Sequence, residues 1–227
     1  MAWELYEGDC LETMKLMNDG IFDLIVTSPP YNIKTGAGAS WNIDDWYEDD
    51  MPEKEYQEWQ TLCVNEMLRV LKSNGVLCYN HKIRQKNGKA IHPLSWLPKE
   101  HLYQEIVWDR KSTHNHCKSY FHPVDERIFI FCKDKPKTFN NMGFQTIWRF
   151  HFETNAKHPA PFPEGLADIC IKAFTEKGDK VLDPFSGSGT VLYVAEQLER
   201  NCTGIEISSD YCDIIKKRMS EIQCSLF

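Results

Sequence analysis

Short apolar runs alternate along this chain with longer segments whose apolar residues recur every three or four positions. The runs have the length of buried strands and lie at residues 3–6, 22–27, 76–79, 105–108, 127–131, 180–183 and 203–206. Segments with one apolar face, typical of amphipathic helices, lie at residues 11–17, 52–71 and 163–177 and begin again at residues 190 and 208. Ser73-Asn74-Gly75 is expected to end the second helix. This alternation predicts an α/β fold with a mostly parallel sheet covered by helices on both faces.

The length and composition fit one globular unit. The chain has 227 residues, of which 42% are hydrophobic and 26% charged, so we expect a single domain over residues 1–227. It contains no run of eighteen apolar residues and no basic, apolar leader, so we expect no membrane contact, no secretion and a cytoplasmic location. The nine cysteines form no C-x-x-C pair, which is typical of reduced, buried thiols. The net charge of −7 disfavours nonspecific coating of nucleic acid but leaves room for a local basic face.

The most informative motif is Thr27-Ser28-Pro29-Pro30-Tyr31, which directly follows the apolar run at residues 21–26. Each proline lacks an amide hydrogen, fixes its own φ and restricts the residue before it. The chain therefore leaves the strand rigidly, with carbonyls free to face a ligand and Tyr31 at the mouth. We interpret the motif as a grip for a flat ring that carries an amine. A proline-rich strand exit with a core tyrosine is the purely structural alternative.

A second motif, Asp183-Pro184-Phe185-Ser186-Gly187-Ser188-Gly189-Thr190, lies between a predicted strand and a predicted helix. Glycines there allow close backbone approach to a ligand at the carboxyl edge of the sheet. Glu206 ends the next strand about twenty residues on, where an acid usually binds ribose hydroxyls. The motif lacks the third glycine of the dinucleotide fingerprint, and the sequence has no G-x-x-x-x-G-K-[ST] phosphate loop. An adenosine ligand without phosphates, such as S-adenosylmethionine, therefore fits best. A structural turn with a solvated Glu206 is the alternative.

Together these motifs resemble the DNA amino-methyltransferases of the permuted, β-class order. The resemblance rests on Thr-Ser-Pro-Pro-Tyr early, His158-Pro159-Ala160-Pro161-Phe162-Pro163 between, and Asp-Pro-Phe-Ser-Gly-Ser-Gly-Thr late, and it spans the chain from Gly8-Asp9 to the last helix. It implies a Rossmann-like, circularly permuted fold with about seven strands, one of them antiparallel. The catalytic half then covers about residues 1–135 and the cofactor half about residues 150–227. The strand at residues 3–6 would complete the cofactor half.

The resemblance also implies a set of cofactor-binding residues. Asp183 and the turn that follows would hold the methionine part of S-adenosylmethionine, Glu206 the ribose, and Asp9 with Cys10 the adenine. The segment after His158 would close over the methionine carboxylate, although Phe162 and Glu164 stand where the commonest family form has a lysine; a capping or buried role for His158 stays open. The full cofactor set is Asp9, Cys10, His158, Asp183, Phe185, Ser186, Gly187, Gly189, Thr190 and Glu206.

The catalytic set is Ser28, Pro29, Pro30 and Tyr31. Ser28 and the Pro29 carbonyl would accept the two hydrogens of an exocyclic amine, while Tyr31 stacks on a base that has left the duplex. In the resembled family a serine in the first position more often accompanies cytosine N4 methylation, and an aspartate adenine N6 methylation. Ser28 therefore favours cytosine N4, with adenine N6 as the alternative.

Contacts with double-stranded DNA are expected from two basic segments within residues 81–122. The candidates are Lys82, Arg84, Lys86, Lys89, Arg110, Lys111, Asn115 and Lys118. Ordinary solvated loops are the alternative. His114, His116, Cys117 and His122 lack a second pair with ligand spacing, so no metal is expected.

Two rival functions stay open: a noncatalytic nucleic-acid-binding subunit, and methylation of a protein glutamine, which usually shows Asn-Pro-Pro-Tyr after the glycine motif. A homodimer and a cognate restriction endonuclease are the candidate protein partners.

Overall fold

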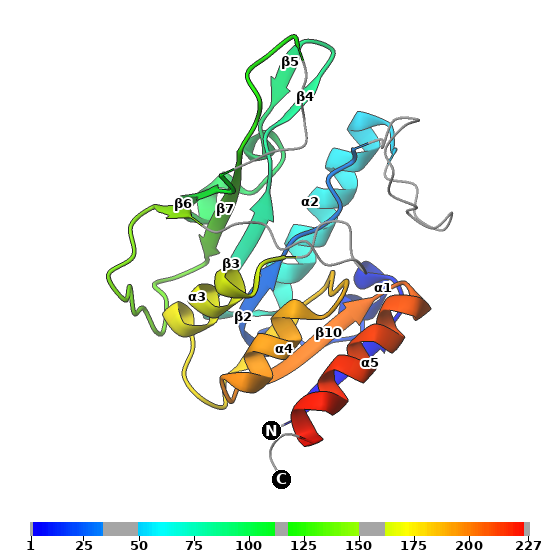
Figure 1. The fold of residues 1–227 in the computed structure, drawn as a ribbon, viewed down its shortest axis with the longest axis vertical. Helices are drawn as coiled ribbons and strands as arrows, with labels where there is room; N and C mark the ends of the chain where they lie inside the picture. The colour runs from blue at the N-terminus through cyan, green and yellow to red at the C-terminus, as the bar shows by residue number, and fades with distance from the viewer. Residues whose placement is uncertain (1, 34–49, 112–117, 150–161, 225–227) are drawn as a thin grey trace.

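Eight strands form one sheet in the part of the chain that the computed structural model describes, which is residues 2–33, 50–111, 118–149 and 162–224, with side chains through residue 221. Their order across the sheet is β1-β10-β9-β2-β3-β7-β6-β8 (Figure 1). β7 runs antiparallel to both of its neighbours, and the other seven strands run parallel to one another. The expected mostly parallel sheet with one antiparallel strand is confirmed. The bounds are β1 Trp3–Glu7, β2 Phe22–Thr27, β3 Leu71–His81, β6 Leu102–Asp109, β7 Asp125–Cys132, β8 Ile147–Arg149, β9 Lys180–Asp183 and β10 Asn201–Glu206.

Helices cover both faces of this sheet. α3 (Glu164–Phe174), α4 (Thr190–Gln197) and α5 (Ser209–Cys224) contribute to one hydrophobic core, and α1 (Cys10–Lys15) and α2 (Glu53–Val70) to the other (Figure 1). Successive side chains of a strand point to opposite faces: in β2, Leu24 lies in the first core and Ile25 in the second. All six residues of β2 are buried, as expected for a strand between two helical layers.

β1 lies beside β10 although the two strands are far apart in the sequence. They pair in parallel from Trp3 opposite Cys202 to Glu7 opposite Glu206. The early strand therefore completes the half of the sheet that carries the glycine turn, as the permuted order requires. On its other side that half meets the catalytic half where β9 pairs in parallel with β2.

One predicted boundary is wrong. α2 ends at Val70 and β3 begins at Leu71, so Ser73-Asn74-Gly75 lies inside β3 and does not end the helix. The pairing of β3 with β2 shifts in this stretch. Gly75 permits the close approach, because a Cβ atom there would lie 2.9 Å from the Asp23 carbonyl oxygen.

The basic segment after residue 80 is also not the plain loop that the sequence suggested. Beyond β3 it forms a hairpin of β4 (Arg84–Lys86) and β5 (Lys89–Ile91). Asn87 and Gly88, with φ of 52° and 72°, supply the positive φ values of a two-residue type I′ turn. The hairpin projects beyond the carboxyl end of β3 (Figure 1). Two 3-10 turns, η1 (Pro93–Ser95) and η2 (Lys99–His101), lead back to β6.

Helices that could cross a membrane are absent from the described residues, because none of them is both long and apolar enough.

Candidate active site

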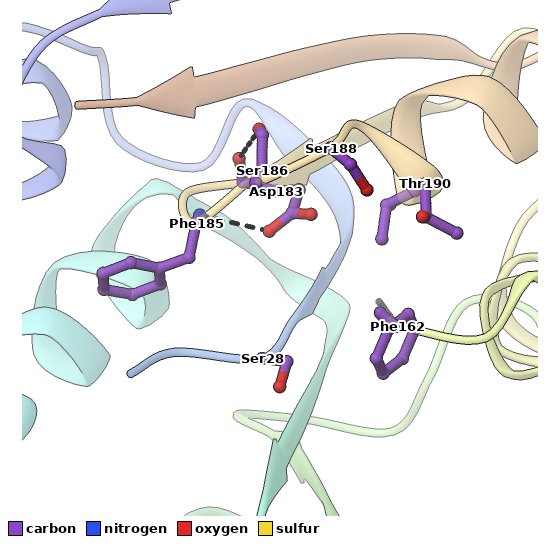
Figure 2. Close-up of a pocket in the computed structure, with 9 residues that line it drawn as sticks. Ser28, Phe162, Asp183, Phe185, Ser186, Ser188 and Thr190 are labelled. Carbon is purple, nitrogen blue, oxygen red and sulfur yellow. Dashed lines mark hydrogen bonds between the residues drawn. The ribbon is translucent and has the colours of Figure 1, made fainter. Parts of the chain in front are cut away.

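The two sequence motifs meet at the carboxyl edge of β2 and β9. The Thr27 hydroxyl donates a hydrogen bond of 2.8 Å to Oδ1 of Asp183, 156 residues later. A pocket of about 80 Å³ opens beside this contact (Figure 2). Typical ligand sites measure roughly 300–1,000 Å³, so this pocket accounts for one part of a cofactor. Its lining consists of Ser28, Phe162, Asp183, Phe185, Ser186, Gly187, Ser188, Thr190 and Val191.

The glycine turn is held in a fixed shape by local hydrogen bonds. The Ser186 hydroxyl donates to the Asp183 carbonyl oxygen at 2.9 Å, and the Phe185 amide donates to Asp183 Oδ1 at 3.1 Å. Gly187 and Gly189 have φ of 48° and 77°, a region that favours glycine. A turn of this kind leads its backbone directly into the first turn of α4, whose amide groups have no partner within the helix.

Asp183 and Glu206 are two buried carboxylates on either side of this turn. Glu206 accepts from the amides of Gly187 at 2.7 Å and Ser208 at 2.9 Å, and burial raises its pKa. Burial, together with repulsion from Glu206, raises the pKa of Asp183 to about 7 against the hydrogen bonds from Thr27 and Phe185. A buried carboxylate held partly protonated is poised to bind a cation, which would favour its charged form.

The remaining predicted cofactor residues, Asp9, Cys10 and His158, differ in their position relative to the glycine turn and the pocket. Asp9 lies beside Glu206, since the Gly8 amide donates to the Glu206 carbonyl oxygen at 2.9 Å, but its side chain caps α1 by accepting from the Glu12 amide at 3.0 Å. Cys10 is buried with its Sγ 3.9 Å from that of Cys63, so its thiol does not face the pocket. His158 lies outside the described residues.

Gly204 lets the glycine turn pack closely on β10. A Cβ atom there would lie 2.6 Å from Ser186 Oγ and 2.8 Å from Leu192 Cδ2. We expect Gly204→Ala to destabilise the fold by about 1–3 kcal/mol, the usual cost of overpacking, and to weaken cofactor binding by shifting Ser186. Thermal unfolding and a cofactor titration measure both effects, with the half-buried neighbour Thr203→Ala as the control. Equal stability of the two variants would contradict the prediction.

The catalytic motif is surrounded by polar side chains that the sequence analysis missed. Ser28 Oγ lies 2.8 Å from the Tyr31 hydroxyl, which donates to Glu126 Oε2 at 3.0 Å. Asn80 reaches Ser28 Oγ at 3.2 Å and Glu126 Oε2 at 2.9 Å through its Nδ2. Asn80 ends an apolar run and Glu126 precedes one. The place of Asn80 near the carboxyl end of β3 was an available signal, whereas Glu126 reaches the same edge only because β7 runs antiparallel to β3.

A second buried cluster, on the α2 side of the catalytic motif, binds the Pro30 carbonyl, which the sequence predicted to be free to face a ligand. The Pro30 carbonyl oxygen lies 2.7 Å from the Tyr56 hydroxyl and 3.2 Å from Gln60 Nε2, both donors. That carbonyl therefore anchors the motif to α2 and is not free to face a ligand. His81 Nε2 lies 2.7 Å from the Tyr56 hydroxyl. Burial lowers the pKa of His81 to about 3, so the ring is neutral in this cluster.

Two of the predicted DNA-binding residues form ion pairs within the protein. Arg84 is buried, and its guanidinium bonds both carboxylate oxygens of Glu53, at 2.6 and 2.9 Å. It also lies over the Tyr56 ring, 4.6 Å from the centroid. Arg110 pairs with Glu126 at 2.9 Å. Both arginines are thus paired with carboxylates within the fold, and their expected contact with DNA stays a prediction.

The other basic candidates lie closer to solvent. Lys82 has its Nζ 5.4 Å from the centroid of the Tyr31 ring, at the catalytic motif itself. Lys86 is 3.5 Å from Glu53. Exposed side chains are those of Lys89, Lys111 and Lys118. Asn115 lies outside the described residues.

Similarity to known proteins extends over most of the chain. The model of a family described as DNA methylase, which covers N6 and N4 enzymes, matches residues 22–147 and 140–217. The chain belongs to this family. It is an S-adenosylmethionine-dependent DNA amino-methyltransferase with the mostly parallel methyltransferase sheet. The site residues fit that cofactor, because the buried carboxylate of Asp183 and the glycine turn line one pocket and the strand-end acid Glu206 accepts from the amide of Gly187 in that turn.

Relatives resemble this methylase over nearly its whole length. The type II methyltransferase M.ScaI of Streptomyces caespitosus is 30% identical over 264 residues, covering 98% of this chain and 83% of the relative. M2.MboI of Moraxella bovis is 28% identical, covering 97% and 88%. Among solved structures, the cytosine-N4-specific PvuII DNA methyltransferase matches with a TM-score of 0.79 at 21% identity, covering 96% and 86%. TTHA0409 of Thermus thermophilus, complexed with S-adenosyl-L-methionine, matches with a TM-score of 0.70 at 22% identity, covering 97% and 94%.

Proposed function

We propose that this methylase modifies the N4 amino group of cytosine in double-stranded DNA. The observation that carries the proposal is the place of Ser28, which stands at the end of β2 in the wall of the cofactor pocket. A hydroxyl occupies the position in which the family's adenine N6 enzymes usually have an aspartate. The likeness to a solved methyltransferase named as cytosine-N4-specific supports the same choice of base.

The residues of the motif act on a weak nucleophile. The lone pair of an exocyclic amine is delocalised into the ring, so hydrogen bonds from its two hydrogens to Ser28 Oγ and the Pro29 carbonyl favour a pyramidal nitrogen. Bound S-adenosylmethionine supplies an electrophilic methyl group. Tyr31 stacks on the base, which must leave the duplex to reach the pocket. Holding base and cofactor in one site makes the transfer effectively unimolecular.

The test is nucleoside mass spectrometry of plasmid DNA from cells that express the protein, with Ser28→Ala expression as the background. We expect 4-methylcytosine above that background. Detection of 6-methyladenine alone would overturn the choice of base. Absence of both would favour the noncatalytic alternative.

DNA binding is proposed to use the exposed lysines of the hairpin and of the segment between β6 and β7. We expect Lys89→Ala and Lys118→Ala to weaken binding of all DNA sequences alike, and each to reduce the slope of log affinity against log salt by about 1, because each removes one phosphate contact. Fluorescence anisotropy over a salt series measures both. Lys135→Ala is the control, since this exposed lysine follows β7 at the opposite edge of the sheet. Unchanged slopes would move the DNA contact elsewhere.

A further inference from the structure

A continuous chain of hydrogen bonds leads from Ser28 into the protein. Ser28 Oγ lies 2.8 Å from the Tyr31 hydroxyl, which lies 3.0 Å from Glu126 Oε2. A carboxylate can only accept, so the single hydroxyl proton of Tyr31 is directed at Glu126. The Tyr31 oxygen then accepts the proton of Ser28. Ser28 Oγ accepts from Asn80 Nδ2 through one lone pair, and its second lone pair is left to face an amine.

Glu126, at the inner end of this series of hydrogen bonds, is surrounded by donors that stabilise a negative charge. Glu126 is 5% exposed, and its other oxygen, Oε1, accepts from Arg110 Nη1 at 2.9 Å. Arg110 Nη2 is 3.4 Å from the Pro123 carbonyl oxygen, which ties the start and the end of the segment between β6 and β7 to the same carboxylate. Asn80, 1% exposed, holds the Ser28 and Glu126 oxygens together through its amide nitrogen. Glu126 is therefore a buried, arginine-paired carboxylate that is hydrogen-bonded to the Tyr31 hydroxyl and reaches Ser28 through it.

We propose that Glu126 is the terminal acceptor of the proton that the target amine loses, reached through Ser28 and Tyr31. The proposal rests on the proposed function. In the transfer a nitrogen–carbon bond forms, the carbon–sulfur bond breaks with its electrons on sulfur, and the sulfonium charge becomes an excess proton on the amine. That proton passes to Ser28 Oγ, the Ser28 proton to the Tyr31 oxygen and the Tyr31 proton to Glu126, which becomes neutral. Glu126 later returns its proton to solvent.

The neutral form of Tyr31 agrees with this role. Burial and the neighbouring Glu126 raise the pKa of Tyr31 above its ordinary value. The phenol therefore keeps its proton at neutral pH and relays it, without becoming a stored anion. Glu126 does not touch the amine. It positions the Tyr31 hydroxyl, and through Tyr31 and Ser28 it accepts the proton that the amine loses.

The test compares Glu126→Gln, Tyr31→Phe and the double variant in single-turnover methylation of DNA. Glutamine still accepts the Tyr31 hydrogen bond but cannot take the proton, and phenylalanine keeps the ring for stacking. We expect each single variant to lower the rate by roughly 10²-fold or more, with cofactor and DNA affinities unchanged. The double variant should be no slower than the slower single variant, because both break one path. Glu105→Gln is the control: Glu105 also pairs with an arginine, 2.9 Å from Arg127 Nε, on the adjacent strand β6.

A second readout needs neither cofactor nor DNA. In protein labelled with ¹³C at the ring carbon that bears the tyrosine oxygen, Glu126→Gln should shift the Tyr31 resonance, identified by its loss in Tyr31→Phe, and Glu105→Gln should not. Wild-type rates in Glu126→Gln, multiplicative losses in the double variant, or an unmoved resonance would each overturn the relay. An absence of transfer by the wild-type enzyme would instead overturn the proposed function, and the relay with it.

Discussion

Ser28→Ala is expected to lower the rate of methyl transfer about 10²–10³-fold while leaving cofactor affinity unchanged. The size is that of losing one acceptor or donor aimed at developing charge in a closed site, about 3–4 kcal/mol. Ser28 lines the pocket directly after β2, and its side-chain hydrogen bonds are with Tyr31 and Asn80. The glycine turn and its bonds to Asp183 do not depend on it. A single-turnover rate and an equilibrium cofactor titration separate the two quantities.

Ser73→Ala is the matched control, because Ser73 is an exposed serine early in β3, away from the carboxyl edge. It should behave as the wild type in both measurements. An unchanged rate in Ser28→Ala would remove Ser28 from the mechanism, and a large loss of cofactor affinity would assign it to binding instead.

Asp183→Asn is expected to stabilise the protein without cofactor at pH 8 and to weaken cofactor binding. The pKa of Asp183 is about 7 in the fold and returns to its ordinary value of 3.8 in the unfolded chain. Between these values the folded state holds a proton that the unfolded state has lost, so stability falls as pH rises through this window. The full cost above pH 7 is at most on the order of 4 kcal/mol. Asparagine keeps an oxygen for the Thr27 and Phe185 hydrogen bonds and removes the buried charge.

Urea unfolding at pH 5 and pH 8 measures this effect. The wild type should lose more stability between the two values than Asp183→Asn does. Asp179→Asn is the opposite control: although burial opposes it, hydrogen bonds from the Glu176 amide and Lys137 lower the pKa of Asp179, so its loss should destabilise the protein at both values. A variant Asp183→Asn that follows the wild-type pH dependence, or that binds the cofactor equally well, would refute the argument.

The elements that sequence reasoning located are those whose signal is local. The strand at residues 22–27 and the turn after Asp183 each carry their own apolar pattern and turn residues, and they were placed correctly. β8 was missed because its three residues are too few to show alternation. The hairpin of β4 and β5 was missed because its strands are mostly polar and half exposed.

The partners of individual side chains were not predictable in the same way. Glu126 reaches Asn80 because β7 runs antiparallel to β3 with Asn80 opposite Ile128, which sets Glu126 diagonally across on the same face. No local pattern fixes that register. Arg84 was predicted as a DNA contact because its basic neighbours are visible in the sequence. Its partner Glu53, 31 residues earlier, is brought to it only by the fold.

The pairing of β1 with β10 carries a consequence for how the protein is made. Trp3 must find Cys202, so β1 emerges from the ribosome before its neighbour in the sheet exists, with the catalytic strands synthesised in between. Pairings of such long separation are slow to form and leave strand edges open to wrong partners. The acidic side chains of Glu4 and Glu7 on β1 are suited to protect this strand until β10 has been synthesised, because charges discourage edge-to-edge association. Competence to bind the cofactor thus arises late in synthesis, after the catalytic motif has long been in place.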